Sequence, residues 1–102
     1  MDHFSLIIII IFIFIFLVSN IDFIKKLLFR SSHRGTKEMD IVLGGYFKKN
    51  HSNLSELDLR EFEKLLDFSD KILTDYFVMN KPNINLENIN IVKKIKKHLE
   101  DQ

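Results

Sequence analysis

An unbroken run of thirteen apolar residues, LIIIIIFIFIFLV at positions 6–18, constrains this chain more than any other feature. A membrane-spanning helix needs about 20 such residues. The run reaches that length only if it is extended through residues 19–24, which include three polar side chains. Lys25, Lys26 and Arg30 follow, so an inserted helix would leave the rest of the chain in the cytoplasm.

Other interpretations of this segment stay open beside the membrane helix. A signal peptide is disfavoured, because no lysine or arginine precedes the run and no small-x-small cleavage site follows it. A transit peptide would be rich in arginine and amphipathic, and the run is neither. We expect residues 1–18 to form a dispensable extension or, alternatively, a membrane segment reaching to residue 24, and residues 19–102 to form the domain.

The composition of the whole chain predicts one small globular domain. Hydrophobic residues make up 46% and charged residues 28% of the 102 positions. The formal net charge of +1 gives no basic field of the kind that binds nucleic acid, so we expect no such partner. The absence of cysteine excludes disulfides, a thiolate nucleophile and a cysteine-based zinc site, and suits a reducing compartment.

Hydrophobic spacing after residue 18 predicts five short helices and no strand. They are expected over about 21–32 and 37–50, from Ser55, from Ser69 or Asp70 to the NKPN turn at 80–83, and through 84–99. The octet INLENINI (84–91) alternates like a strand, but it continues into a helical stripe and is assigned as helix. The fold class is therefore all-α, a small five-helix bundle preceded by an apolar segment.

Local signals place several of the expected helix ends. Asn20, Thr36 and Ser55 are the expected N-caps, and Ser55 with Asp58 resembles a capping box. Gly35 is expected to end the first helix in the left-handed conformation.

The expected core is made of the apolar residues that recur at helical spacing. These are Ile21, Ile24, Leu27, Leu28, Met39, Val42, Leu43, Tyr46, Phe47, Leu59, Phe62, Leu65, Leu66, Ile72, Leu73, Tyr76, Phe77, Leu86, Ile89, Val92, Ile95 and Leu99. Gly44 and Gly45 fall inside the second helix at a cost of about 1 kcal/mol each. Either the helix bends there or another backbone packs against it, and the sequence does not separate the two.

A search for catalytic chemistry finds no constellation. The four histidines show no metal-ligand spacing, and no glycine-rich phosphate loop occurs. Asp67, Asp70 and Asp75 suit a helix boundary better than a cation site. The basic stretch KKIKKHLED, 93–101, is interpreted as a solvated helix face. We therefore expect no enzyme and no metal site.

Two segments carry a resemblance to a known family. LLFRSSHRGTKEMDIVLGGYF, followed by LSELDLREFEKLLDFSDKILTDYF, resembles the FAD assembly factor SdhE family, whose mitochondrial members are called succinate dehydrogenase assembly factor 2. The family's Arg-Gly-x-x-Glu element is matched by Arg34, Gly35 and Glu38. The element after it is matched, in order and spacing, by Phe62, Leu65, Leu66, Asp70, Leu73 and Tyr76.

The resemblance implies a chaperone that holds no cofactor stably. Such a factor binds the flavoprotein subunit of succinate dehydrogenase, and in some bacteria that of fumarate reductase, and promotes covalent FAD attachment in that partner. It implies a monomer with Arg34, Gly35 and Glu38 as partner-binding residues. The missing transit peptide favours the bacterial cytoplasm over an organelle, with membrane association through the N-terminal segment as an open alternative. The alternative is a membrane-tethered helical adaptor that recruits an unrelated cytoplasmic partner.

The resemblance also sets expectations for substitutions at the partner-binding residues. Glu38 is expected either to pair with Arg34 or to bind the partner, and Glu38→Ala to weaken binding more than it lowers the melting temperature. Gly35→Arg is expected to abolish binding and leave the fold largely intact.

Overall fold

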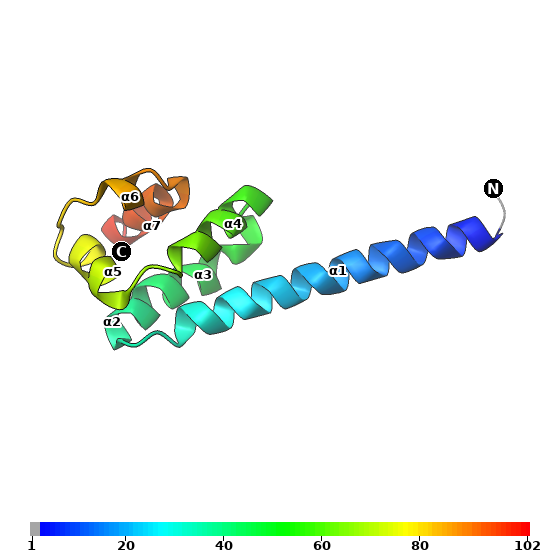
Figure 1. Ribbon diagram of the computed structural model, residues 1–102, viewed down its shortest axis with the longest axis horizontal. Coiled ribbons are helices and arrows are strands. Elements are labelled where there is room, and N and C mark those ends of the chain that lie inside the picture. Colours follow the sequence, from blue (N-terminus) through cyan, green and yellow to red (C-terminus); the bar gives the residue numbers. More distant parts are fainter. Residues whose placement is uncertain (1–2) are drawn as a thin grey trace.

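A computed structural model describes residues 3–102, which form an all-α fold. The elements are α1 (His3–Ser32), α2 (Lys37–Met39), the π-helical turn η1 (Asp40–Gly44), α3 (Gly45–Asn50), the 3-10 turn η2 (His51–Asn53), α4 (Glu56–Leu65), α5 (Asp70–Phe77), α6 (Ile84–Glu87) and α7 (Asn90–Glu100). No strand occurs within residues 3–102, so the all-α prediction is confirmed. Figure 1 shows a compact bundle from which the first helix projects.

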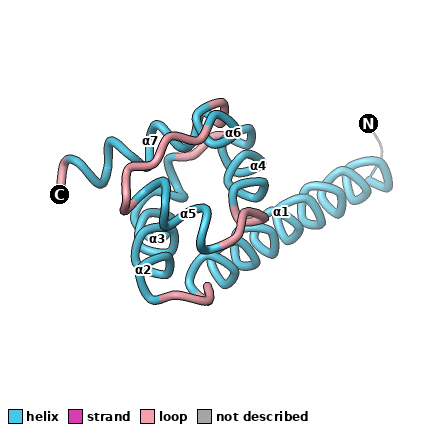
Figure 2. The backbone as a smooth tube through the Cα atoms, turned by 60° about the vertical axis from the view of Figure 1, so that its left-hand side comes forward, coloured by secondary structure: helices cyan, strands magenta, loops and turns pink. Residues whose placement is uncertain are grey.

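Helix α1 is a single helix of 30 residues, about two and a half times as long as the predicted first helix. The expected N-cap at Asn20 is wrong, because the helix runs through it without interruption. Neither glycine nor proline lies between positions 3 and 32, and a lone asparagine costs too little to stop a helix propagating through apolar neighbours. The result is a molecule 61 Å long and 24 Å across, with residues 4–18 outside the bundle (Figures 1 and 2).

The last part of α1 belongs to the bundle. Leu27 and Ser31 are fully buried, and Phe23, Ile24 and Leu28 pack against the core. The predicted core position Ile21 is wrong, since its side chain is 51% exposed. The domain division after residue 18 stays a prediction, since α1 crosses that position unbroken.

The predicted second helix forms as α2, η1 and α3 in sequence, and the π-turn ends at the glycine pair. Thr36 is the N-cap, as predicted, and its hydroxyl accepts a hydrogen bond from the Met39 N–H. At Gly44 a Cβ would lie 3.0 Å from the Ser31 carbonyl oxygen, whereas at Gly45 it would meet nothing within 4 Å. The alternative of close backbone packing is therefore confirmed at Gly44, where α1 packs directly, and the helix forms a π-turn up to this residue.

Helices α4 and α5 begin at the caps that their sequences predict. The Ser55 hydroxyl accepts from the Asp58 N–H and the Asp58 carboxylate accepts from the Ser55 N–H, which confirms the capping box. Ser69 caps α5 by accepting from Ile72. Ile72 itself is 40% exposed, so its assignment to the core is wrong.

The predicted last helix is divided into α6 and α7. Ile89 lies between them with extended backbone, φ −96° and ψ 117°. Asn83 caps the short α6, and Glu61, a residue of α4, caps the start of α7. Each of the two caps satisfies free N–H groups at a helix start, and Glu61 Oε2 accepts from the Ile91 N–H at 3.0 Å. A tertiary contact thus decides where the helix restarts.

The core lies between the end of α1, the α2–η1–α3 segment, α4, α5 and α7. Phe47 and Phe62 stack at its centre with ring centroids 4.7 Å apart. The predicted core positions that are buried are Leu27, Met39, Val42, Leu43, Tyr46, Phe47, Phe62, Leu65, Leu66, Leu73, Tyr76, Leu86, Val92 and Ile95. Apart from Ile21 and Ile72, the other predicted core positions pack partly buried against this cluster.

Candidate partner-binding site at the α1–α2 turn

The turn between α1 and α2 consists of residues 33–36 and begins directly after Ser32, the last residue of α1. His33 Nδ1 lies 2.8 Å from the Phe29 carbonyl oxygen, and the two rings stack with centroids 4.0 Å apart. Thr36 takes an extended conformation and caps α2. The chain direction on both sides of Arg34 and Gly35 is therefore set by local contacts.

Arg34 connects this turn by hydrogen bonds to the α4–α5 connection. Its Nε donates to Asp70 Oδ1 at 2.8 Å, Nη1 donates to the Leu66 carbonyl at 2.6 Å, and Nη2 donates to the Phe68 carbonyl at 2.6 Å. These carbonyls close the end of α4 and the turn after it, where backbone acceptors lack helical partners. With only 12% of its side chain exposed, Arg34 joins the α4–α5 connection to the start of α2.

Gly35 is required by a close approach rather than by an unusual backbone angle. Its φ is not positive, so the expected left-handed helix cap is wrong. Its N–H donates to Asp70 Oδ2 at 2.7 Å, and a Cβ at this position would lie 2.6 Å from that oxygen. The Asp70 carboxylate thus receives one hydrogen bond from Arg34 and one from Gly35, and only glycine leaves room for this arrangement.

Glu38 stands on the outer side of the turn, in the first turn of α2. Its side chain is exposed, and it forms no hydrogen bond or ion pair with any of residues 3–102. The guanidinium of Arg34 is instead paired with Asp70. The carboxylate of Glu38 therefore points to solvent beside the exposed backbone of Gly35 and, one helical turn on, the 64% exposed side chain of Ile41.

The geometry changes the expected effect of Gly35→Arg. Any side chain at Gly35 must displace the Asp70 carboxylate, which Arg34 also holds. That substitution therefore acts on the packing of the turn as well as on its outer surface. Glu38, with no internal contact to lose, gives the cleaner test of partner binding.

The three aspartates around α5 do not converge on one point. Asp67 pairs with Arg30, Asp70 with Arg34, and Asp75 with Lys71 and Lys81. No group of three or more potential metal ligands occurs in the described part of the chain. Asp67 and Asp70 lie at the α4–α5 boundary, as predicted, whereas Asp75 lies within the second half of α5.

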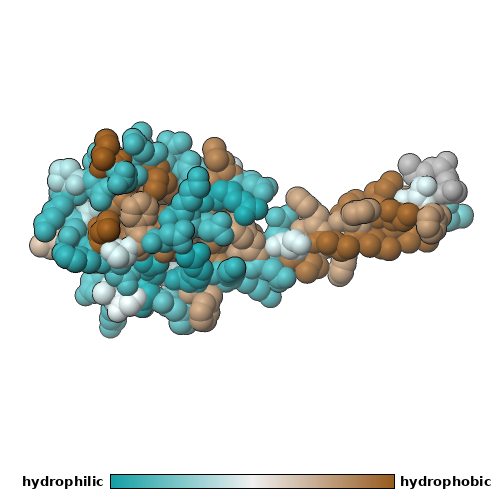
Figure 3. Space-filling view, in the orientation of Figure 1, coloured by the Kyte–Doolittle hydropathy of each residue, from teal (hydrophilic) through white to brown (hydrophobic). Residues whose placement is uncertain are grey.

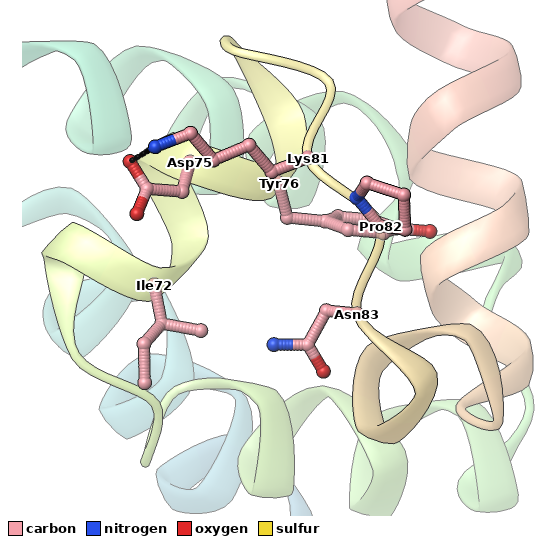
Figure 4. A pocket seen from close by; sticks show the side chains of 6 residues that line it. All are labelled: Ile72, Asp75, Tyr76, Lys81, Pro82 and Asn83. Atoms are coloured by element: carbon pink, nitrogen blue, oxygen red, sulfur yellow. Dashed lines mark ion pairs between the residues drawn. The ribbon is translucent and has the colours of Figure 1, made fainter.

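Among the surface cavities formed by residues 3–102, two are relevant to the site. One, of about 170 Å³, is formed between α5 and the loop before α6, where the Lys81 side chain reaches across to Asp75 above Ile72 and Asn83 (Figure 4). The other, of about 370 Å³, adjoins the α1–α2 turn and is lined by Leu28, Phe29, Lys25, Lys48, His33 and Ser32. Next to the turn there is therefore a cavity whose lining combines apolar side chains with lysines.

Sequence reasoning missed the partners of the turn inside the chain. Asp70 is expected from the sequence as a helix-start residue and as part of the second family element, but not as the partner of Arg34 and Gly35. Asp40, whose carboxylate accepts from the Arg34 N–H, is not among the predicted site residues. The signal that could have found Asp70 is its fixed place after the Leu65–Leu66 pair, in the same two-part pattern that contains Arg34.

The structure defines the chain as a small all-α bundle in which hydrogen bonds within the chain hold a turn that carries an exposed glycine, followed by an exposed glutamate. Comparisons with known proteins identify its family. A sequence model of the family described as the flavinator of succinate dehydrogenase matches residues 25–99, and the chain belongs to that family.

Individual relatives support the same membership. The chain is 36% identical over 58 residues to the FAD assembly factor SdhE of Acetobacter pasteurianus, covering 57% of this chain and 53% of that protein. It is 32% identical over 81 residues to the Caenorhabditis elegans protein named succinate dehydrogenase assembly factor 2, mitochondrial. This match covers 76% of this chain and 67% of that protein. The chain thus spans about half of the first relative and two thirds of the second. No solved structure matches it.

Proposed function

We propose that this protein is an assembly factor that binds the flavoprotein subunit of succinate dehydrogenase and promotes covalent attachment of FAD to that subunit. The observation that carries the proposal is the family match, which covers residues 25–99 and so includes the whole bundle and the α1–α2 turn. The relatives named FAD assembly factor and succinate dehydrogenase assembly factor support the same role.

Three residues of the turn have distinct tasks in this proposal. Glu38 contacts the flavoprotein through its exposed carboxylate, and Gly35 allows the partner's backbone to approach without a side chain in between. Arg34 has a positioning role: its hydrogen bonds to the α4–α5 connection keep Gly35 and Glu38 in place. The family's Arg-Gly-x-x-Glu element then combines one positioning residue with two contact residues.

The factor acts by binding rather than by its own chemistry. It favours the arrangement of flavoprotein domains in which attachment proceeds, which is a shift in population produced by differential affinity. FAD stays with the flavoprotein, and the proposal assigns no stable cofactor to this chain. The flavoprotein of fumarate reductase is a second client, and the factor works as a monomer whose bundle lies in the bacterial cytoplasm.

The experiment uses a bacterial strain that lacks its own assembly factor. The full chain, its Glu38→Gln variant and a matched Glu100→Gln variant are expressed, and covalent flavin on the flavoprotein is read by in-gel fluorescence. Wild type and Glu100→Gln are expected to restore the signal, because Glu100 is exposed at the end of α7, away from the turn. Glu38→Gln keeps the side-chain size but removes the charge, and is expected to lower the signal at least about tenfold.

Two results would count against the proposal. No restored flavin with any variant, although the chain is folded and present, would favour the adaptor with an unrelated partner. Equal restoration by Glu38→Gln and Glu100→Gln would keep the assembly role but remove Glu38 from the interface.

A further inference from the structure

The outer half of α1 exposes an apolar surface that nothing in the bundle covers. From Phe4 to Val18 each large hydrophobic side chain is between 37% and 72% exposed. Figure 3 shows this part as a hydrophobic rod that leaves a mostly hydrophilic bundle. An isolated helix of this kind is unstable in water as a monomer, because burial of apolar area is what stabilises such a surface.

The apolar surface surrounds the whole helix. Successive residues of an α-helix are about 100° apart, so four in a row sample its full circumference. Phe12, Ile13, Phe14 and Ile15 are all apolar, and 68%, 54%, 66% and 54% exposed. A partner protein lying in a groove would need only one apolar stripe, as in an amphipathic helix. A helix that is apolar all round needs an apolar medium on every side.

Length and flanking charge identify that medium. The stretch from Phe4 to Ile21 contains 18 residues, which at 1.5 Å each span about 27 Å, within the range for the hydrocarbon core of thinner bilayers. Asp22 is exposed where this stretch ends, and Lys25 and Lys26 follow within one turn. We propose that residues 4–21 of α1 cross a lipid bilayer, with the bundle on the cytoplasmic, positively flanked side.

The anchor is continuous with the bundle, and this sets the position of the α1–α2 turn. Residues 22–32 continue the helix for about 16 Å beyond the membrane boundary, and the α1–α2 turn with Arg34 follows directly. Residues 4–32 contain neither glycine nor proline, and α1 is unbroken through them. The bundle is also fastened to α1 close to the membrane, since the Arg60 guanidinium lies 4.4 Å from the centroid of the Phe23 ring. The turn is thus held at a fixed height rather than on a flexible tether.

Membrane insertion is tested with the full chain reconstituted into vesicles of phosphatidylcholine and phosphatidylglycerol, followed by flotation and alkaline carbonate extraction. The variant Ile10→Lys with Ile13→Lys places two charges at the centre of the stretch. The control, Leu57→Lys with Ile84→Lys, adds the same charge at exposed apolar positions of the bundle. Wild type and control are expected to float and to resist extraction, and the first variant to lose at least about tenfold of its bound fraction.

Circular dichroism separates membrane insertion from folding. The Ile10 and Ile13 side chains are exposed, so the double variant is expected to keep the helical bundle. If the variant and wild type float equally, the proposal is overturned. If wild type instead remains in solution as a defined oligomer without lipid, a second copy of the chain covers the helix and the proposal is also overturned.

Topology is tested with single cysteines, which the natural chain lacks. In spheroplasts, a membrane-impermeant maleimide is expected to label His3→Cys, which lies just before the membrane stretch, from outside, and Lys97→Cys only after lysis. Labelling of neither position before lysis would show a helix lying on the inner surface rather than crossing, and would overturn the spanning arrangement. None of these readouts depends on flavin, so the anchor can fail while the assembly role stands, and the reverse.

Discussion

At the scale of single residues, Arg34 does most to join parts of the chain that are distant in sequence. Its planar guanidinium presents donors in a fixed fork, and three of its nitrogens meet a carboxylate and two carbonyls that lie 32 to 36 positions away. Gly35 adds a fourth hydrogen bond to this network, from its N–H to the same Asp70 carboxylate. The outward display of Glu38 therefore depends on a network in which Glu38 takes no part.

Replacing Arg34 by lysine should cost stability although the charge is kept. A lysine ammonium cannot reach three acceptors in a fork, so at least one buried carbonyl loses its partner, at about 1–3 kcal/mol in the free energy of unfolding. Urea unfolding followed by circular dichroism measures the change. The control is Arg30→Lys, whose ion pair with Asp67 is exposed and should be worth less than about 1 kcal/mol. Equal losses in the two variants would contradict the assigned role of Arg34.

The two neighbouring glycines should respond to alanine with opposite signs. At Gly44 a Cβ would press on the backbone of Ser31 and Ser32 at 3.0–3.1 Å, and we expect a loss of about 1–2 kcal/mol. At Gly45 the space is open, and alanine should raise the free energy of unfolding by about 0.5–1 kcal/mol through higher helix propensity. Thermal unfolding of the pair checks this, and a destabilised Gly45→Ala would show an unrecognised contact there.

At the scale of elements, the sequence predicts what is determined locally. Thr36, Ser55 and Ser69 cap helices because a hydroxyl three residues before a free N–H is sufficient. The π-turn before Gly45 and the restart at Asn90 were not predictable in this way, because the first depends on α1 packing against Gly44 and the second on Glu61 of α4.

The candidate site is likewise determined in part by local sequence and in part by contacts between distant residues. Arg34, Gly35 and Glu38 are visible in the sequence as an ordered motif, and their role as partner-binding residues remains a prediction. The contacts that orient them were not visible, because Asp70 lies 36 positions from Arg34 and no local pattern links the two. The contacts that the motif makes inside the chain could be learned only from the fold.

The link between α4 and α7 should make stability depend on acidity. Lys94 donates to Asp58 Oδ2 at 2.8 Å, and this hydrogen bond holds the pKa of the buried Asp58 carboxyl below its ordinary value, against the opposing effect of burial. The unfolded chain then binds the proton at higher pH than the folded chain. The stabilisation is complete above about pH 4 and is lost as the pH falls below it.

The Asp58 contribution is measured by comparison with Asp58→Asn. Melting temperatures recorded from pH 6 to pH 2.5 should fall more steeply for wild type than for the variant, and the variant should start lower at pH 6. Parallel curves would mean that Asp58 does not carry the acid dependence. Other carboxylates contribute equally to both proteins and cancel in the comparison.

At the scale of the whole molecule, two surfaces of different chemistry lie at different distances along one continuous helix. The outer half of α1 is apolar and exposed, and the turn at its other end carries an exposed glycine; we propose lipid as the surroundings of the first and a protein as the partner of the second. Because α1 is unbroken, the distance between them is fixed by helix geometry. An assembly factor built in this way would meet its client close to the membrane surface.

The most direct test of the assembly role uses purified components. The flavoprotein subunit of succinate dehydrogenase, prepared without covalent flavin, is mixed with FAD in the presence or absence of the full chain, and flavin that resists denaturation is followed over time. We predict that the rate of attachment rises with added chain and saturates near one chain per flavoprotein. An unchanged rate, with the chain folded and the flavoprotein able to bind FAD, would contradict the central claim.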